Sequence, residues 1–309
     1  MNVIDVLLPG LQTTVQDLGR WGHQSIGVPV AGPMDPFAHR RANALAGNER
    51  GAATLEVTLQ GPTLQFTDAR TVAIAGAEFD VTLDDVPVEA SPFQVRSGGV
   101  LRFGERRRGA RAYVAVSGGF DVPRVLGSRS THLPTRTGGV EGRALVRGDR
   151  LPLGTPAGPA RAHSDAPASR PGAMPSIRVL LGPQDDRFVS DALAVLVSAP
   201  YHVTVDSNRM AYRLEGEALT HRAGADIVSD ATPMGSIQVP SSGQPLLLMA
   251  DRQTTGGYAK LATIITADLG VAGQAAPGDR IQFRLCSRSE AVAALIQRER
   301  PLLAIEARV

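Results

Sequence analysis

Short segments typical of β-strands dominate the pattern of apolar and polar positions along the chain. Each segment is rich in apolar or β-branched residues and is bounded by Gly, Pro or Asp. This pattern predicts a mainly β protein in which strands greatly outnumber helices. The predicted strands are Leu55–Leu59, Thr71–Ala75, Phe79–Leu83, Arg111–Ser117, Ile177–Leu181, His202–Asp206, Gly235–Val239, Leu246–Met249 and Arg280–Leu285.

Three helices are predicted from end signals and apolar spacing. Asp35 is a good N-cap with Pro36 at the first helical position, and Gly47 is a stop signal, so residues 36–46 are expected to be helical. Residues 186–198 repeat apolar side chains at helical spacing and end before Pro200. Residues 289–299 form the third, which Pro301 is expected to halt.

The segment 154–176 separates two halves of the chain. It contains mostly Pro, Ala and Gly with almost no large apolar residue, which is typical of a linker or a long surface loop. Each half ends in a similar strand signal, at 148–153 and at 278–283. We therefore predict two related β-rich domains, residues 1–153 and 177–309, built as barrels or sandwiches.

Composition excludes several classes of function. The 32 basic and 30 acidic residues leave a net charge of +2, which gives no electrostatic reason to propose nucleic-acid binding. The densest basic run, Arg106–Arg108, is interpreted as a solvated loop. A single cysteine, Cys286, excludes an internal disulfide and fits a reducing compartment, and we expect it to be a buried small apolar residue. No apolar stretch is long enough to span a membrane, and the N-terminus lacks a signal-peptide layout, so a cytoplasmic protein is expected.

The usual enzyme motifs are missing. The sequence has no phosphate loop, no dinucleotide-binding glycine motif, no nucleophile elbow and no zinc-protease motif. Its six histidines are scattered without metal-ligand spacing, so no metal site is predicted.

The most informative polar segment is Asp251–Lys260, which directly follows a predicted strand. It could be a hairpin loop in which Gly256 and Gly257 supply positive φ. Seven hydrogen-bonding side chains in ten residues favour a binding loop instead. Lys260 is also the only lysine, since every other basic residue is an arginine. An amine can lose its proton when it is desolvated and a guanidinium cannot, so Lys260 is the leading catalytic candidate.

Two further segments are candidates. Residues 207–216 could be a turn followed by the start of a strand. Alternatively, the guanidinium groups of Arg209 and Arg213 could each donate paired hydrogen bonds to a carboxylate or phosphate, and the pattern leaves both interpretations open. Residues 10–20 are expected to be loop, with a weak suggestion of function.

Together and in this order, these segments resemble a carboxyltransferase-type family. The family includes the second subunit of allophanate-hydrolase-like complexes (KipA, or the C-type subunit of 5-oxoprolinase) and is similar to the carboxyltransferase portion of urea carboxylase. The departures are Ala259, where proline is common, and Ala231 and Ser241, where glycines are expected. The segments that carry the resemblance are 9–20, 42–48, 55–62, 207–216, 235–240 and 251–260.

The resemblance implies two cyclophilin-like β-barrels with a few short helices and an obligate first subunit as partner. Its leading implication is ATP-dependent opening of 5-oxoproline to glutamate by a multi-subunit complex, to which a third, TIM-barrel-like subunit would belong. The first alternative is biotin-dependent carboxyl transfer to a urea-like amide, with carboxybiotin delivered by a carrier protein. The second is a non-catalytic regulator of a kinase inhibitor.

The candidate site residues follow from these segments and the resemblance. We expect Lys260, Asp251 and Tyr258 to be catalytic, Lys260 with an arginine holding a carboxylate while Asp251 or Tyr258 handles a proton. The expected substrate-binding residues are Arg209, Tyr212, Arg213, Gln238, Gln253, Thr254, Thr255, Gly256, Gly257, Gln16, Asp17, Arg20 and Asn43.

Overall fold

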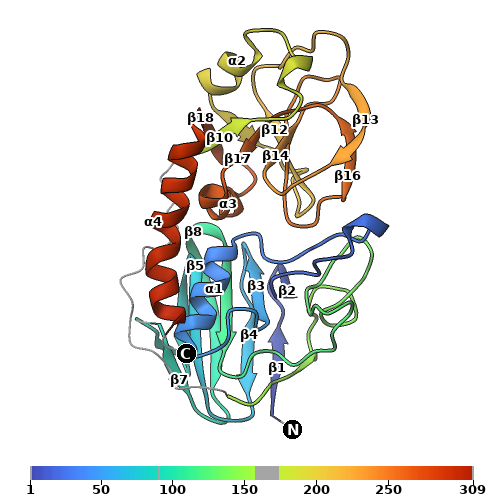
Figure 1. Cartoon of the computed structure of the whole chain (residues 1–309). Coiled ribbons are helices and arrows are strands. Elements are labelled where there is room, and N and C mark those ends of the chain that lie inside the picture. The colour runs from blue at the N-terminus through green and yellow to red at the C-terminus, as the bar shows by residue number, and fades with distance from the viewer. Residues whose placement is uncertain (1, 90, 157–173, 308–309) are drawn as a thin grey trace. The chain divides into compact units, whose positions relative to one another are not determined.

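The computed structural model describes residues 2–89, 91–156 and 174–307, which form two compact units (Figure 1). Unit 1 comprises the described residues of 1–20, 31–170 and 299–309, and unit 2 comprises those of 21–30 and 171–298. The units are therefore not simple halves of the chain, because a short early segment belongs to the second unit and the C-terminal segment to the first. Most of the predicted linker, residues 157–173, lies outside the described residues.

Unit 1 is built on a curled nine-stranded sheet. Its main path runs in the order β2-β3-β8-β4-β1-β9, and β5 pairs with β6, β7 and β8. One face encloses the large apolar core that contains Ile4, Leu55, Phe66, Leu101 and Val114. The strands are β1 (Val3–Leu8), β2 (Gln12–Gln16), β3 (Thr54–Thr58), β4 (Thr63–Phe66), β5 (Arg70–Leu83), β6 (Val86–Pro87), β7 (Phe93–Val95), β8 (Val100–Val116) and β9 (Arg150–Pro152).

The strands β5 and β8 are longer than the sequence pattern indicates. The two predicted strands 71–75 and 79–83 are one continuous strand, and the run Arg106–Arg108 lies inside β8, so the prediction of a loop there is wrong. The three arginines are exposed, as expected, because this part of the β5–β8 pair extends beyond the core. Cross-strand ion pairs support it, including Arg107 with Asp80 at 2.6 Å. The expected loop at 10–20 is also wrong over residues 12–16, which form β2 against β3.

Helix α1 (Pro36–Leu45) packs on the sheet face formed by β5 and β8 (Figure 1). The contact is made by small side chains, with Ala38 and Ala42 against Ala73 and Ala115. As predicted, Asp35 caps the helix, since its Oδ1 accepts a hydrogen bond from the backbone N–H of Ala38 at 3.1 Å.

A buried carboxylate fixes the chain just before α1. Glu56 on β3 accepts hydrogen bonds from the Tyr113 hydroxyl at 2.6 Å and from the Met34 backbone N–H at 2.8 Å. Burial raises the pKa of Tyr113 well above 10, and the Glu56 charge adds to this effect. The hydroxyl therefore stays protonated and holds the helix entrance to the sheet.

Unit 2 is a closed seven-stranded barrel in the order β10-β17-β14-β15-β12-β11-β18, and the parallel pairing of β10 with β18 closes it. A separate two-stranded ribbon, β13 with β16, belongs to the same unit (Figure 1). The barrel strands are β10 (Ser176–Leu181), β11 (Tyr201–Val203), β12 (Ala211–Glu215), β14 (Ser236–Gln238), β15 (Leu246–Leu248), β17 (Lys260–Ile264) and β18 (Arg280–Leu285), and the ribbon strands are β13 (Asp226–Ala231) and β16 (Thr255–Tyr258).

The mainly β prediction is therefore confirmed, with one closed barrel and one open, curled sheet. The helical predictions need two corrections. The segment 186–198 is helical only over α2 (Ala192–Ser198), because a 3-10 turn (η2, Asp185–Arg187) precedes it. Helix α4 (Arg288–Glu306) continues through Pro301, where Arg40 binds Glu299 and Glu306 at 2.7 and 2.8 Å, one residue on each side of the proline. The remaining short helices are η1 (Gln24–Ile26), η3 (Thr266–Asp268) and α3 (Leu269–Gly273).

The α1 residue His39 makes folding stability depend on pH. It is fully buried, and its Nδ1 lies 2.9 Å from the Thr54 Oγ1. Burial lowers its pKa from 6.5 to about 4, so between these values the unfolded chain binds a proton that the folded chain does not. Stability should therefore fall as the pH is lowered through this window, by up to about 3 kcal/mol in total.

The measurement is the urea midpoint of unfolding between about pH 4.5 and about pH 7.5 for the wild type and for His39→Gln. We expect the wild type to lose stability more steeply toward acid than the variant, which lacks this proton. Parallel curves for the two proteins would contradict the assignment.

Candidate functional site

Lys260 is the first residue of β17 and points into the interior of unit 2. Its residue exposure is 1% although it carries an ammonium group. Its Nζ donates to Asp230 Oδ2 at 2.7 Å, and Asp230 lies on the ribbon strand β13. Among the described residues Asp230 is the one hydrogen-bond acceptor of Nζ, so two of the three ammonium donors are left for water or a ligand.

Gln184 completes the contact between the barrel and the ribbon. Its Nε2 donates to Asp230 Oδ2 at 3.0 Å, and its Oε1 accepts from the Lys260 backbone N–H at 3.2 Å. The hydrogen bond from Lys260, followed by those from Gln184 and the Ala231 backbone, lowers the pKa of Asp230 to about 2. Asp230 is therefore ionised at neutral pH, and its side chain is still 46% exposed.

Two further glutamines lie beside Lys260. Gln238 is its partner in the β14–β17 pair, and its Nε2 donates to the backbone carbonyl of Tyr258 at 3.3 Å. Gln253 Nε2 lies 3.5 Å from Gln238 Oε1. We call Lys260, Asp230, Gln184, Gln238 and Gln253 the lysine–glutamine site.

Gly256 of β16 is required by close packing and not by a turn. Neither Gly256 nor Gly257 has positive φ, so the hairpin-loop interpretation of this segment is wrong. A Cβ on Gly256 would lie 2.5 Å from Gln238 Nε2 and 3.1 Å from Gln253 Nε2. The absence of a side chain therefore lets the two amides pack directly against the β16 backbone. Thr254 and Thr255 lie beside it in backbone contact with Thr232 and Ala231, and Tyr258 is 38% exposed.

Asp251 is bound to Arg209. The guanidinium donates to both carboxylate oxygens, at 2.9 and 3.0 Å, and both side chains are buried. The Asp251 backbone N–H also donates to the Arg209 carbonyl at 2.8 Å, so the pair joins the segments that follow β15 and precede β12. Tyr212 is a core residue whose hydroxyl donates to the Ala275 carbonyl at 3.2 Å, and Arg213 is exposed.

The candidates of unit 1 converge on one segment, Ser128–Thr131. Asp17 accepts hydrogen bonds from the hydroxyls of Ser128 and Ser130 at 2.5 and 2.7 Å and from the Arg129 backbone N–H at 2.6 Å. Burial raises the pKa of Asp17, but these bonds outweigh it and the net shift is downward. Arg20 donates to the Ser130 carbonyl, and Gln16 donates to the Thr131 carbonyl at 3.0 Å.

Asn43 has a different role from these three. Its Nδ2 donates to the Ala52 carbonyl at 2.7 Å, and its Oδ1 accepts from Asn48 at 3.1 Å, so it fixes the loop after α1. Each of the four unit 1 candidates therefore has a defined structural contact within that unit.

The structure adds two residues that sequence reasoning missed, Asp230 and Gln184. The signal for Asp230 was indirect, because a buried lysine requires a carboxylate and the sequence offers 30 acidic residues. Gln184 carries no local signal. The described residues contain no group of three or more His, Cys, Asp or Glu side chains placed to hold a metal ion. No described helix is long and apolar enough to cross a membrane.

Comparison with known proteins places this geometry in a family. The family model described as "Carboxyltransferase domain, subdomain A and B" matches residues 26–285. The chain belongs to the carboxyltransferase family. This assignment confirms the resemblance seen in the sequence.

Relatives of the carboxyltransferase-family chain fall into two groups. It is 38% identical to the C-type subunit of 5-oxoprolinase from Haemophilus influenzae, over 94% of this chain and 93% of that protein, and 38% identical to the Escherichia coli protein of the same name, over 96% of each. The crystal structure of Kluyveromyces lactis urea carboxylase matches 98% of this chain with a TM-score of 0.91 and 32% identity. The matched part is 29% of that larger chain.

The Arg209–Asp251 pair gives a stability prediction. Asp251→Asn removes one charge of a buried, bidentate pair, so we expect a loss of about 3–5 kcal/mol in unfolding free energy. Exposed Asp226→Asn in the same unit is the control and should change stability by less than about 0.5 kcal/mol. The double variant Arg209→Met/Asp251→Leu should recover most of the loss, because it removes both charges of the pair together. Equal urea midpoints for Asp251→Asn and Asp226→Asn would contradict this structural role.

Proposed function

We propose that the chain is one subunit of a multi-subunit amide-processing enzyme, an ATP-dependent 5-oxoprolinase that opens 5-oxoproline to glutamate. The observation that carries this proposal is the nearly full-length similarity to the C-type 5-oxoprolinase subunits of two bacteria. Under the proposal the chain works with a first subunit and with a third, TIM-barrel-like subunit in the cytoplasm.

The lysine–glutamine site supports this function because its groups complement a cyclic amide. A lactam presents a carbonyl oxygen and an N–H on one edge of a small ring. The amides of Gln238 and Gln253 offer donors and acceptors for both. The remaining donors of Lys260 would stabilise negative charge that develops on the carbonyl oxygen when the ring is attacked.

Asp230 is placed to hold the Lys260 ammonium and to contact a water molecule at the same time. Its carboxylate holds the ammonium in place, and its exposure leaves one side open to water. We propose that the pair orients the amide and that the Asp230 carboxylate positions an attacking water by accepting a hydrogen bond from it. Asp251, paired with Arg209, then acts as a support for the strand ends, while Tyr258 remains a candidate proton donor at the exposed edge of the ribbon.

The lysine–glutamine site does not fit a nucleoside triphosphate. It contains one ammonium whose charge Asp230 already compensates, and the sequence lacks a phosphate loop. We therefore assign ATP binding to a partner subunit, and no step in this chain depends on it.

Biotin-dependent carboxyl transfer is the second candidate function, favoured by the close structural match to urea carboxylase. The ureido ring of biotin is a cyclic urea, which also presents a carbonyl oxygen and an N–H, so the glutamines and Lys260 offer it matching groups. Bound carboxybiotin would supply an activated carboxyl group, and Lys260 would hold its carboxylate. A non-catalytic regulator is the third candidate, and it differs from both enzymes because it should tolerate loss of Lys260.

The first functional prediction concerns partners. The lysine–glutamine site contains an ion pair and amides but no assembled nucleophile–base pair, so the purified chain should show little turnover of 5-oxoproline with ATP. Adding the partner subunits should restore turnover. The assay compares glutamate release by the chain alone, by the partners alone and by the mixture, with urea and a carboxybiotin source as the alternative substrates. Full activity of the chain alone would contradict the proposal.

The second functional prediction concerns Lys260. In the reconstituted complex, Lys260→Arg should lower kcat/KM by about a hundredfold or more, because a guanidinium cannot occupy the ammonium position beside Asp230 without displacing the glutamines. Lys260→Met, which keeps the volume but removes the donors, should lose at least as much. Arg284→Lys, at an exposed position of the same unit, is the control and should leave the rate unchanged.

The melting temperature of each variant shows whether a lower rate comes from lost catalysis or from lost folding stability. Burial of Lys260 means that the arginine variant should also lose about 1–3 kcal/mol of stability, so rates are compared well below each Tm. A folded Lys260→Met complex with the wild-type rate would rule out catalysis at this lysine and would favour the regulator.

A further inference from the structure

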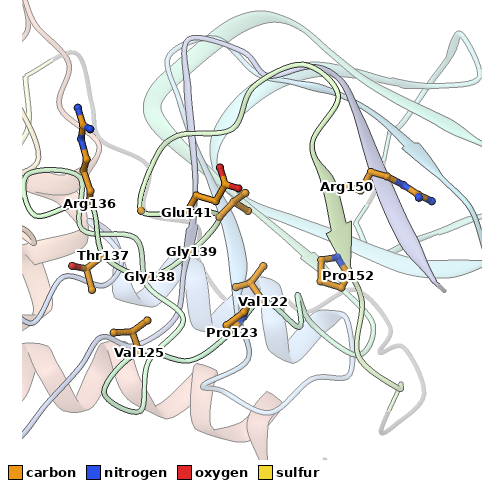
Figure 2. Close-up of a pocket in the computed structure, with 12 residues that line it drawn as sticks. Val122, Pro123, Val125, Arg136, Thr137, Gly138, Gly139, Glu141, Arg150 and Pro152 are labelled. Carbon is orange, nitrogen blue, oxygen red and sulfur yellow. The ribbon is translucent and has the colours of Figure 1, made fainter.

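A cavity lies in unit 1, and none of its lining residues belongs to the lysine–glutamine site. Its volume is approximately 710 Å³, which falls in the range of small-molecule sites. Val122, Pro123 and Val125 form an apolar floor, with Arg136 on one side and Pro152 on the other (Figure 2). None of the catalytic or binding candidates discussed above lines it.

The cavity wall is held in a fixed shape by buried polar contacts. Ser128, Arg129 and Ser130, which follow Val125, are bound to Asp17 through the three short hydrogen bonds described above. The Gly139 backbone N–H donates to the Arg129 carbonyl at 2.9 Å. The loop that forms the wall is therefore tied to β2 and to itself before any ligand binds. Because the cavity is preformed, ligand binding requires little further ordering of this loop and so loses little conformational entropy.

Close packing of glycines fixes the opposite part of the same loop. A Cβ on Gly139 would lie 1.9 Å from Thr131 Oγ1, and one on Gly142 would lie 2.0 Å from the Arg136 carbonyl. Both glycines also have positive φ. The chain around Arg136 therefore cannot relax into another conformation without losing these contacts.

The charged residues that line the cavity are not all compensated. Arg150 is paired with Asp5 at 3.1 Å. Glu141 is paired with Arg143 at 3.0 Å. The exposed Arg136 guanidinium makes no hydrogen bond or ion pair with the described residues of the chain. The uncompensated charge at the rim is therefore positive.

Arg136 also has a strained backbone. Its φ is 50°, in the left-handed region that glycine or asparagine occupies at lower cost. An arginine at such a position keeps a side chain that the turn itself disfavours. Residues held in this way concentrate at functional sites, and the exposed guanidinium supplies a function that a glycine lacks.

We propose that this cavity binds a small amphipathic carboxylate, with its apolar body on the Val122–Pro123–Val125 floor and its carboxylate on Arg136. The planar guanidinium presents two parallel donors that match a carboxylate. With one uncompensated cation among the described rim residues, the site suits a monoanion better than a phosphate ester. The inference is independent of the proposed reaction, because none of its residues belongs to the lysine–glutamine site.

The test uses three probes that share one apolar body: 4-cyclohexylbutanoate, the corresponding alcohol and the corresponding amine. Binding to the full chain is measured by isothermal titration calorimetry and by ligand-observed NMR. We expect saturable binding of the acid, with the alcohol and the amine about tenfold weaker or more. Failure of the oxoprolinase assay would leave this result unaffected.

Three variants locate the site. Arg136→Gly removes the guanidinium and relieves the strained φ, so its Tm should stay unchanged or rise while acid binding weakens about tenfold. Val125→Asp, at a floor position that is 37% exposed, should abolish acid binding by repulsion. Arg150→Gln is the matched control at the other side of the cavity and should change the acid Kd less than about twofold.

Three outcomes would overturn the proposal. One is the absence of saturable acid binding, and another is amine binding as tight as that of the acid. The third is a weakening of acid binding in Arg136→Gly that is no larger than the weakening in Arg150→Gln.

Discussion

A buried ammonium group needs a counter-charge, and the arrangement of unit 2 around Lys260 meets that requirement. Removing an isolated ammonium from water is costly unless a counter-charge lies beside it. Asp230 supplies the charge from the ribbon, at 2.7 Å, and Gln184 fixes that carboxylate from the barrel side. The position of the ribbon on the barrel is thus linked to the charge state of one side chain. Loss of either partner would leave the other without its compensation.

The two members of this pair differ in solvent exposure, and this difference leaves one of them accessible to a ligand. Lys260 is almost completely buried, whereas the Asp230 side chain is about half exposed. A fully buried pair would be inert, because separating its charges in a low-dielectric environment is costly. Here the carboxylate can be reached by water or by a ligand, while the ammonium keeps a fixed position with two donors that no described residue occupies. The Arg209–Asp251 pair, buried on both sides, provides the contrast within the same unit.

The sequence predicts the elements that carry a local signal, such as alternating apolar residues or a helix cap. It does not predict elements whose extent depends on solvent exposure or on partners far away in the sequence. The barrel strand 280–285 and the capped helix α1 carry strong local signals. The arginine-rich middle of β8 does not, because a strand that extends beyond the core is exposed and shows no apolar alternation. Helix α4 passes Pro301 because ion pairs to Arg40, far away in the sequence, hold both flanks. Local signals cannot report such partners.

Local sequence signals also separate the site residues that could be predicted from those that could not. Lys260 is conspicuous because it is the only lysine among many arginines, and the adjoining segment contributes Gln253 and Gly256. The position of Asp230 beside Lys260 depends on the register of the ribbon, in which Asp230 lies opposite Gly256. A shift of one residue would turn its side chain to the other face of the ribbon. A bulge between Asp226 and Asp230 sets that register. The catalytic hypothesis thus depends on a backbone irregularity that brings one particular carboxylate to the lysine.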